Sequence, residues 1–331
     1  MKAVLVSELG SIDNGRVTEV ADPTPGPGQL LIEVHAVPVN YVDIVTISGR
    51  YQFKPKLPYT PGKGPAGIVR ATGAGVSRFR PGDRVLGMSE SGGYAQLALV
   101  DEAQSYRLPD DMPFTDAAAM SLAFDTAWMA LRERARIQPG DNVLVLGASG
   151  AVGNAAVQLA RAMGANAVLG AVSSPAKFAA VRDAGATAMV DLSQSDLRES
   201  VRAQVFAATA DHGADVIIDP LGGEIFEAAI RSIAWRGRVV VLGFAAGGIP
   251  SLKINYLMLK NMEVSGLQIS DYRRRMPDLV RQCYDEVFAF YTAGKVKAPP
   301  SNSVPLVDFA RAMHQVEDRT APGRVVLLPQ A

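Results

Sequence analysis

A segment in the middle of the chain combines apolar runs with regularly spaced glycines. Val143–Leu146 is apolar without alternation, which is typical of a parallel strand covered on both faces. Gly147, Gly150 and Gly153 follow, and apolar residues then recur at helical spacing over about 154–163. A glycine turn between strand and helix leaves backbone N–H groups at the helix N-terminus, where the dipole favours an anion. The pattern predicts a pyrophosphate site or, in the simpler alternative, only a tight turn.

The glycine spacing departs from the usual dinucleotide fingerprint. The chain has G-x-x-G-x-x-G in place of G-x-G-x-x-G, with Ala148 where the first glycine of the fingerprint would stand. NAD-binding chains place Asp or Glu about 20 residues beyond the loop, where it bonds the ribose 2′-hydroxyl. That position is held here by Ser173.

The residues after Ser173 bear on the choice of coenzyme. Ser174, Pro175 and Lys177 follow closely, so two hydroxyls, a helix start and an ammonium group lie together. A carboxylate would repel a 2′-phosphate, whereas these groups attract one. Ser174 and Pro175 also form an ordinary helix start, which does not exclude the other role. The sequence favours NADPH over NADH.

Two further predicted strands lead into turns of small residues. Val216–Asp219 runs into Pro220–Gly223, and Val239–Leu242 runs into Gly243–Ala245. Both turns fall at carboxyl ends of strands, the edge where an open α/β sheet binds ligands. Each alone could be an ordinary turn, but together they favour a cofactor cleft.

Composition excludes several classes of function. The chain has 331 residues, enough for two domains, with 48% hydrophobic and 20% charged residues. Lys+Arg and Asp+Glu balance at 33 each, so we expect neither nucleic acid nor a membrane as partner. The N-terminus enters the strand-like Ala3–Val6 without a secretory apolar region, and a cytoplasmic location is expected. The single cysteine, Cys283, excludes a thiolate zinc cluster and falls on an apolar helical face.

The chain changes character near residue 116. The first part is β-rich with dense Pro and Gly punctuation, as in a small twisted barrel, and carries a long loop, Asn40–Lys63. A helix over about 115–135 begins a second part in which strands and helices alternate, as in a doubly wound parallel sheet. A long helix over about 274–293 follows, and the terminal strand GRVVLLP is expected to return to the first domain.

Motifs along nearly the whole chain carry a family resemblance. In chain order they are Val39–Asp43, Ser48–Tyr51, Leu57–Gly62, Gly92–Ala95, Thr126–Trp128, Gly147–Gly153, Asp219–Gly223 and Leu259–Asn261. With this ordered set the chain resembles the zinc-independent quinone oxidoreductase branch of the medium-chain dehydrogenase/reductase superfamily, the zeta-crystallin-like enzymes.

The resemblance implies an α/β architecture and a set of site residues. A GroES-like catalytic domain (1–121 with 268–331) would flank a Rossmann domain (122–267), usually in a homodimer. Asn40, Asp43 and Tyr51 would be catalytic, and Tyr41, Phe53 and Tyr59 would line the substrate. NADPH would be bound by Tyr51, Thr126, Ala148, Ser149, Gly150, Ala151, Val152, Gly153, Ser173, Lys177, Asp219, Gly223, Leu242, Gly243, Phe244, Ala245, Leu267 and Gln268.

The chain also departs from its relatives. Zinc alcohol dehydrogenases carry Cys at the place of Asn40 and a His-Glu pair at Lys63-Gly64, so no metal is expected. Leu192 replaces a Tyr or His that relatives often have near the 2′-phosphate. Ile44 and Val45 fill the place of a frequent active-site aromatic.

Metal-free hydride transfer needs an acceptor that requires little electrophilic help. A quinone qualifies, with Asn40 orienting a carbonyl oxygen unless it only forms a turn, and with Asp43 contacting substrate or ordering the loop. The close alternative is reduction of an α,β-unsaturated ketone, aldehyde or enoyl thioester, with Tyr41, Tyr51 or Tyr59 as proton donor unless these only pack. A third alternative is a non-catalytic, crystallin-like NADPH-binding protein. The scattered histidines argue against a hydrolytic triad.

Overall fold

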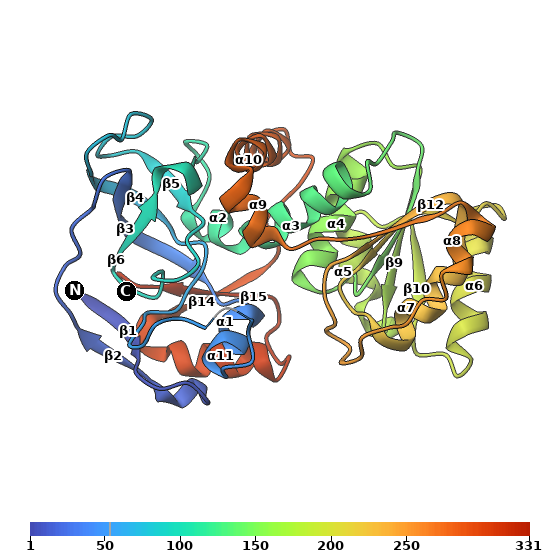
Figure 1. Cartoon of the computed structure of the whole chain (residues 1–331), viewed down its shortest axis with the longest axis horizontal. Helices are drawn as coiled ribbons and strands as arrows, with labels where there is room; N and C mark the ends of the chain where they lie inside the picture. The colour runs from blue at the N-terminus through green and yellow to red at the C-terminus, as the bar shows by residue number, and fades with distance from the viewer. Residues whose placement is uncertain (53) are drawn as a thin grey trace. The chain divides into compact units, whose positions relative to one another are not determined.

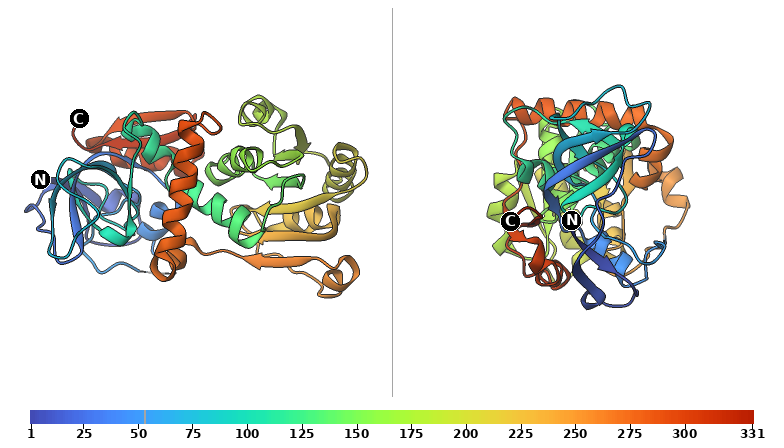
Figure 2. Two further views of the ribbon diagram at one scale, coloured as in Figure 1. Left: turned by 90° about the horizontal axis from the view of Figure 1, so that it is seen from above. Right: turned by 90° about the vertical axis from the view of Figure 1, so that its left-hand side faces the viewer.

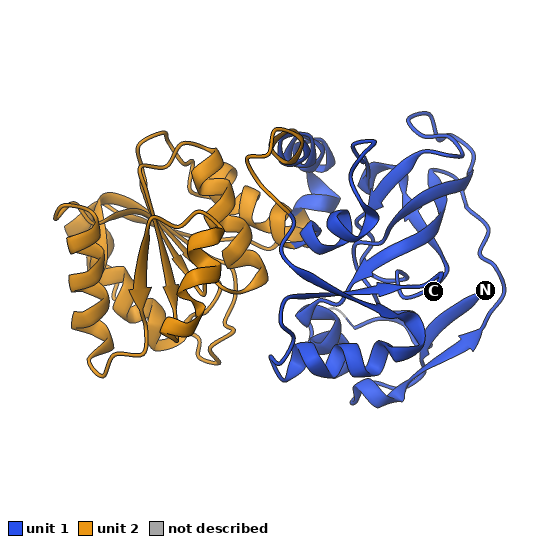
Figure 3. Ribbon diagram, turned by 180° about the vertical axis from the view of Figure 1, so that it is seen from behind, with its two compact units in different colours: residues 1–122, 272–288, 298–331 blue, residues 123–271, 289–297 orange. Residues whose placement is uncertain are grey.

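The computed structural model describes every residue of the chain except Phe53. The described residues form two compact units, shown in different colours in Figure 3. Unit 1 consists of Met1–Leu122, Tyr272–Phe288 and Ala298–Ala331, and unit 2 consists of Ala123–Asp271 and Ala289–Lys297.

Unit 2 is built on a six-stranded parallel sheet (Figure 1). Its order is β10-β9-β8-β11-β12-β13, so the chain moves outward from β8 in one direction and then outward from β11 in the other. The strands are β8 (Asn142–Leu146), β9 (Ala167–Val172), β10 (Ala188–Asp191), β11 (Ala214–Asp219), β12 (Ile233–Val241) and β13 (Glu263–Gly266). This is the expected doubly wound order, whose reversal between β8 and β11 marks the ligand-binding edge.

The helices of unit 2 connect these strands. They are α3 (Ala123–Trp128), a π-helical turn (Met129–Arg134), α4 (Ala151–Ala162), α5 (Phe178–Asp183), α6 (Leu197–Ala208), α7 (Gly223–Ala229) and α8 (Asn255–Lys260), with short 3-10 turns at Pro175–Lys177 and Ile230–Ser232. The single helix expected over about 115–135 is wrong. It breaks at Leu122, whose φ of 59° lies in the left-handed region and cannot continue an α-helix.

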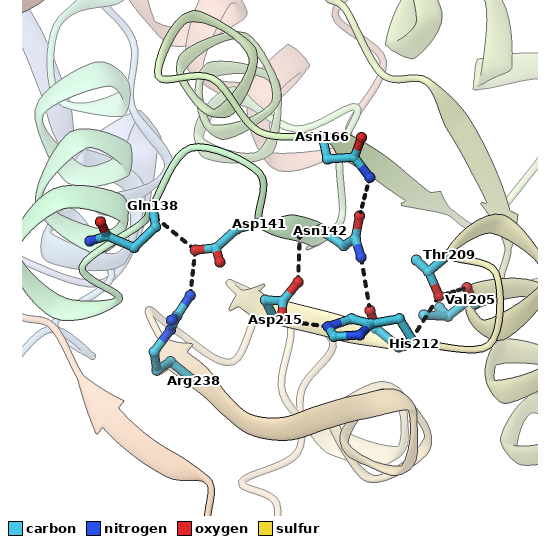
Figure 4. A network of polar contacts seen from close by, with 10 residues as sticks. Gln138, Asp141, Asn142, Asn166, Val205, Thr209, His212, Asp215 and Arg238 are labelled. Carbon is cyan, nitrogen blue, oxygen red and sulfur yellow. Dashed lines mark hydrogen bonds and ion pairs between the residues drawn. The ribbon is translucent and has the colours of Figure 1, made fainter.

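A network of polar contacts lies at the amino-terminal edge of the sheet (Figure 4). The Asn142 backbone N–H donates to Asp215 Oδ2 at 2.8 Å, and Asp215 Oδ1 lies 2.8 Å from His212 Nε2. Asp141 accepts the Gln138 backbone N–H at 2.8 Å and pairs with Arg238. These contacts hold the starts of β8, β11 and β12 together, at the edge opposite to their carboxyl ends.

Unit 1 is dominated by a seven-stranded, mostly antiparallel sheet of order β14-β15-β3-β4-β5-β7, with β6 also paired to β3. Its strands are β3 (Gln29–Pro38), β4 (Ala66–Thr72), β5 (Arg84–Gly87), β6 (Leu97–Asp101), β7 (Ser105–Arg107), β14 (Ser301–Pro305) and β15 (Arg324–Leu328); β1 (Lys2–Val6) and β2 (Gly15–Glu19) form a second, two-stranded sheet. β15 pairs with β3, so the terminal strand does return to the first unit, as the red and blue strands of Figures 1 and 2 show.

Helices complete unit 1. Three lie wholly within it: α1 (Tyr41–Ile47), α2 (Phe114–Met120) and α11 (Phe309–Glu317). Two lie in it for most of their length, α9 (Ile269–Arg275) and α10 (Pro277–Thr292), and 3-10 turns occur at Ile12–Asn14, Glu102–Gln104 and Leu306–Asp308. The long helix expected over about 274–293 is present as α10, but it begins at Pro277, because Pro277 cannot donate an N–H and disfavours helical backbone in the residue before it; residues 274 and 275 end α9. The segment expected as a loop, Asn40–Lys63, begins with α1.

The limits of the two units differ from the expected domain limits. Residues 268–271 and 289–297, expected in the first domain, fall in unit 2. Gln158 of α4 explains the second segment, because its amide accepts the Lys297 backbone N–H at 2.8 Å and donates to the Lys297 carbonyl at 3.1 Å. Among the described residues, no helix is both long and apolar enough to span a bilayer.

Candidate functional site

The glycine loop lies at the carboxyl end of β8. Gly147 has φ of +63°, and the Gly150 N–H donates back to the Gly147 carbonyl at 2.9 Å. Helix α4 then begins at Ala151, earlier than expected, and its first backbone bond runs from the Asn154 N–H to the Gly150 carbonyl at 2.8 Å. The preceding amides, at Ala151 to Gly153, are the unsatisfied donors of a helix start.

Gly153 is required for this geometry. It lies inside α4, and a Cβ atom there would be 2.2 Å from the Gly147 carbonyl oxygen. A side chain would therefore force the helix away from the loop. Ser149 and Gly150 are exposed, so the loop presents backbone donors to an incoming group. The arrangement fits a bound pyrophosphate.

The carboxyl end of β9 carries the residues expected at the 2′-phosphate. Ser173 and Lys177 are exposed, and Ser174 accepts the Ala176 backbone N–H at 3.3 Å as the cap of a 3-10 turn. The capping role is confirmed for Ser174. The Leu192 backbone N–H donates to the Val172 carbonyl at 2.9 Å, which ties the end of β10 to the end of β9.

Asp219 ends β11 and is fully buried. Its Oδ1 accepts the backbone N–H groups of Leu221 and Gly222, both at 2.9 Å. Its Oδ2 has no hydrogen-bond partner among the described residues. Burial raises the pKa of this carboxyl against the opposing effect of the two N–H donors. A buried acceptor without a partner is costly unless a ligand supplies a donor.

The remaining predicted cofactor residues are tied to the same edge. The Leu242 N–H donates to the Asp219 carbonyl at 2.8 Å, and the Ala245 N–H donates to the Pro220 carbonyl at 3.2 Å. The Leu267 N–H donates to the Val241 carbonyl at 3.1 Å, and Gln268 follows directly. Parallel strands thus bring Ala148 to Gly153, Ser173, Lys177, Asp219, Gly223, Leu242 to Ala245, Leu267 and Gln268 to one edge of the sheet. Thr126 lies apart from them, on α3, which packs against α4.

In unit 1 the side chain of Asn40 is held between two other segments. Its Nδ2 donates to the Lys63 carbonyl at 3.3 Å, and its Oδ1 accepts from Arg324 Nη2 at 2.8 Å. Arg324 Nε also donates to the Ala119 carbonyl at 3.2 Å. The Asn40 amide therefore joins the end of β3, the end of the long loop and β15.

Asp43 lies in the first turn of α1 and is 3% exposed. Its Oδ2 accepts the Asn40 backbone N–H at 3.1 Å and lies 3.3 Å from the Tyr94 hydroxyl. Burial raises the pKa of the Asp43 carboxyl to about 6, although the Lys63 charge and the hydrogen bonds from Asn40 and Tyr94 act to lower it. Asp43 thus orders the loop through a buried carboxylate.

The predicted substrate-side aromatics have different surroundings. Tyr59 is 9% exposed, and its hydroxyl has no hydrogen-bond partner among the described residues. Burial and the nearby Asp43 charge raise the pKa of Tyr59. Tyr51 lies under the Lys63 ammonium group, Tyr41 is half exposed, and Phe53 falls outside the described residues.

Lys63 belongs to a charged group that the sequence did not reveal. Its side chain is 4% exposed, and Nζ pairs with Glu90 and lies 5.6 Å from the centroid of the Tyr51 ring. Arg273 is 1% exposed, with Nη1 3.6 Å from Glu90 Oε1. The one sequence signal was a lysine enclosed by glycines, Gly62-Lys63-Gly64; Arg273 and Arg324 gave none, because their partners are remote in sequence.

The comparisons with known proteins identify the family of the chain. Residues 26–110 match the alcohol dehydrogenase GroES-like domain, and residues 151–285 match the zinc-binding dehydrogenase family. A quinone oxidoreductase-like protein 2 homolog from Nematostella vectensis is 35% identical over 331 residues, which cover 98% of this chain and 88% of that protein. The chain belongs to the zinc-independent, quinone oxidoreductase-type branch of the medium-chain dehydrogenase/reductase superfamily.

Solved structures agree with this membership. The native structure of a mycobacterial quinone oxidoreductase superposes with a TM-score of 0.91 at 30% identity, covering 99% of this chain and 100% of that one. A mycobacterial protein complexed with NADPH superposes with a TM-score of 0.89 at 29% identity, covering the same shares of the two chains. Unit 1 thus contains the GroES-like domain and unit 2 the Rossmann-like domain of a medium-chain oxidoreductase that uses a nicotinamide cofactor. Among the described residues, no three His, Cys, Asp or Glu side chains group as a metal site would require.

The Asp43 carboxyl predicts a measurable pH dependence of stability. The folded state holds its proton up to about pH 6, whereas the unfolded chain releases it near 3.8. Its contribution to stability is therefore complete below pH 3.8 and is lost as pH rises through 6. Relative to Asp43→Asn, the wild-type free energy of unfolding should fall by roughly 3 kcal/mol between about pH 3 and pH 8. Urea unfolding of both proteins at several pH values measures this difference.

An exposed aspartate supplies the control. Asp183 lies on the surface of α5, and Asp183→Asn should leave the pH dependence of unfolding parallel to that of the wild type. If the free energies of unfolding of Asp43→Asn and wild type varied in parallel with pH, the buried Asp43 carboxyl would not be the source of the pH dependence.

Proposed function

We propose that this protein is an NADPH-dependent, metal-free reductase whose acceptor is a quinone. The observation that carries the proposal is the edge of the unit 2 sheet. It combines free helix-start amides with Ser173 and Lys177, and no carboxylate stands where an NAD-binding chain needs one. The mycobacterial relative complexed with NADPH supports this coenzyme, and the names of the quinone oxidoreductase relatives support the acceptor.

Each group at this edge has a role in the proposal. The amides of Ala151 to Gly153 donate to the pyrophosphate, and Ser173 and Lys177 bind the 2′-phosphate. Asp219 Oδ2, which is buried without a partner, accepts a hydroxyl of the cofactor. The bound cofactor supplies a hydride, and the protein supplies its orientation.

Residues of unit 1 hold the acceptor in this proposal. Asn40 acts as a positioning residue, since both ends of its amide already bond to protein groups. The unpartnered Tyr59 hydroxyl donates to an acceptor oxygen, and Tyr51, whose ring lies by the Lys63 ammonium group, contacts the acceptor. Asn40, Lys63 and Gly64 fill the places of zinc ligands in related alcohol dehydrogenases, so catalysis rests on positioning and on fixed polar groups.

An acceptor panel tests the proposed reaction. Oxidation of NADPH is followed by absorbance with ortho- and para-quinones, enones and enoyl-CoA esters. We expect turnover with at least one quinone. Turnover of enones or enoyl esters alone would replace the quinone with the alternative acceptor. No turnover with any acceptor of the panel would contradict the proposal that the protein is a reductase.

The coenzyme assignment predicts the effect of removing Lys177. Loss of one charged hydrogen bond to the 2′-phosphate costs about 1.5–3 kcal/mol, so Lys177→Ala should weaken NADPH binding roughly 10- to 100-fold and leave NADH binding unchanged. Calorimetric titration of both coenzymes measures this split. Lys295→Ala, an exposed lysine of the same unit, should change neither affinity. Equal affinity of Lys177→Ala and wild type for NADPH would exclude the assigned role.

We further propose that the protein forms a homodimer through β13. This strand ends the sheet, and exposed apolar side chains gather on it and on α8: Val264 is 36%, Leu259 64%, Met258 73% and Ile254 79% exposed. Pairing with the same strand of a second copy would cover this edge.

Val264→Lys tests the proposed dimer. A charge on the edge strand should convert a dimer to a monomer in light scattering after size exclusion. Val307→Lys, at a 71% exposed position of unit 1, should leave the mass unchanged. A wild type that is monomeric at micromolar concentration would overturn the proposal.

A further inference from the structure

Lys63 is a buried cation whose hydrogen-bonding capacity is only partly used. Its side chain is 4% exposed, and Nζ donates to Glu90 alone among the described residues. An ammonium group has three donors, so two remain for another acceptor. Tyr51 and Asp43, both on the proposed acceptor side, lie close enough to interact with its charge.

Two glycines fix the position of Lys63. Gly62 and Gly64 have φ of +100° and +78°. A Cβ on Gly62 would lie 2.3 Å from Tyr94 Cδ1, and one on Gly64 would lie 2.5 Å from Ser121 Oγ. The backbone on both sides of Lys63 is therefore packed against side chains of unit 1, so the main chain that carries the ammonium group is fixed in position.

The charges next to Lys63 favour an added anion over an added cation. Lys63 pairs with Glu90, its charge acts on Asp43, and Arg273 Nη1 lies 3.6 Å from Glu90 Oε1. An added anion would accept from the remaining donors of Lys63, whereas an added cation would meet an ammonium group that is already buried.

We propose that the Lys63 ammonium group hydrogen-bonds to the acceptor oxygen that becomes anionic during reduction, which makes Lys63 a catalytic residue. The inference rests on the proposed function and deepens it. It assigns to this chain an acceptor class in which reduction places negative charge on oxygen, such as quinones and conjugated carbonyl compounds. The acceptor gains the hydride and its electron pair, the oxygen becomes anionic, and water then supplies the proton.

This contact is stronger in the transition state than in the ground state. A neutral carbonyl oxygen accepts only a dipolar hydrogen bond, whereas a developing oxyanion also interacts with the full ammonium charge in a buried setting. Because Lys63 is held in place before the reaction, little reorganisation is needed when the charge appears. Glu90 competes for the same ammonium group, so the oxyanion must share it with a half-exposed carboxylate.

A bound phenol reports on this contact without turnover. 4-Nitrophenol changes absorbance on ionisation and resembles a hydroquinone anion. In the full-length protein saturated with NADP⁺, we expect the phenolate to bind at least about tenfold more tightly than the phenol, which lowers the pKa of the bound phenol by about one unit. Lys63→Met should abolish this preference. No binding of the phenolate to the wild type, or an equal preference in Lys63→Met, would overturn the proposal.

Glu90→Gln separates this role from a structural one. If Lys63 served only the ion pair, Lys63→Met and Glu90→Gln would have similar effects. The proposed role predicts opposite effects, because removing the competing carboxylate should strengthen phenolate binding. Unchanged or weaker binding to Glu90→Gln would overturn the proposal even if Lys63→Met failed to fold. Lys295→Met is the matched control, since Lys295 lies at the same 5.6 Å from an aromatic ring centroid, that of Phe290, but on the surface.

Kinetics supply a second readout. Enolates are more basic than hydroquinone anions, so Lys63→Met should lower kcat/KM for enones by a larger factor than for quinones. An equal loss for both would overturn the role. If the wild type reduces no acceptor, the proposed function fails, whereas the phenolate titration still decides the role of Lys63.

Discussion

The site in unit 1 depends on the hydrogen bonds of one amide, that of Asn40. It bonds to the Lys63 carbonyl at the end of the long loop and to Arg324 of the terminal strand. Its backbone N–H bonds to Asp43 in the first turn of α1. Since Asn40 and Arg324 are 284 positions apart, the chain must close β15 onto β3 before this group can form. The hydrogen bonds of Asn40 are thus coupled to folding of the whole unit.

Unit 2 brings remote residues together in a different way, through a series of parallel strands. Six parallel strands end at one edge, so short turns far apart in sequence become neighbours, and backbone bonds such as that from the Leu242 N–H to the Asp219 carbonyl join them. At the opposite edge, Asn142, Asp215 and Arg238 take part in contacts that hold the strand starts. The side-chain contacts near the strand starts and the backbone donors of the glycine loop therefore lie at opposite edges of the sheet, and Asp219 Oδ2 has no hydrogen-bond partner among the described residues.

This contrast explains what the sequence could predict. The strands, their order and the edge that carries Gly147 to Gly153 follow from local apolar runs and glycine turns, which are short-range signals. The break at Leu122 and the start of α4 before Gly153 were missed, because tertiary packing overrides helix propensity there. The charged group around Lys63 was missed, because its one local signal was the lysine between Gly62 and Gly64. Its members come from four separate segments of the chain, and the sequence distances between these segments do not indicate which side chains will meet.

The loss of stability that the buried Asp43 carboxyl causes bears on the role of the loop that contains it. A buried carboxyl with a pKa near 6 weakens the folded state at neutral pH, and an amide in its place would avoid that loss. Yet the carboxylate accepts the Asn40 N–H, and its charge faces Lys63. Without it, the Lys63 charge would lose a nearby carboxylate, and α1 would lose an acceptor in its first turn. A stability cost that keeps both a loop and a buried cation in place is typical of a site selected for chemistry rather than for folding.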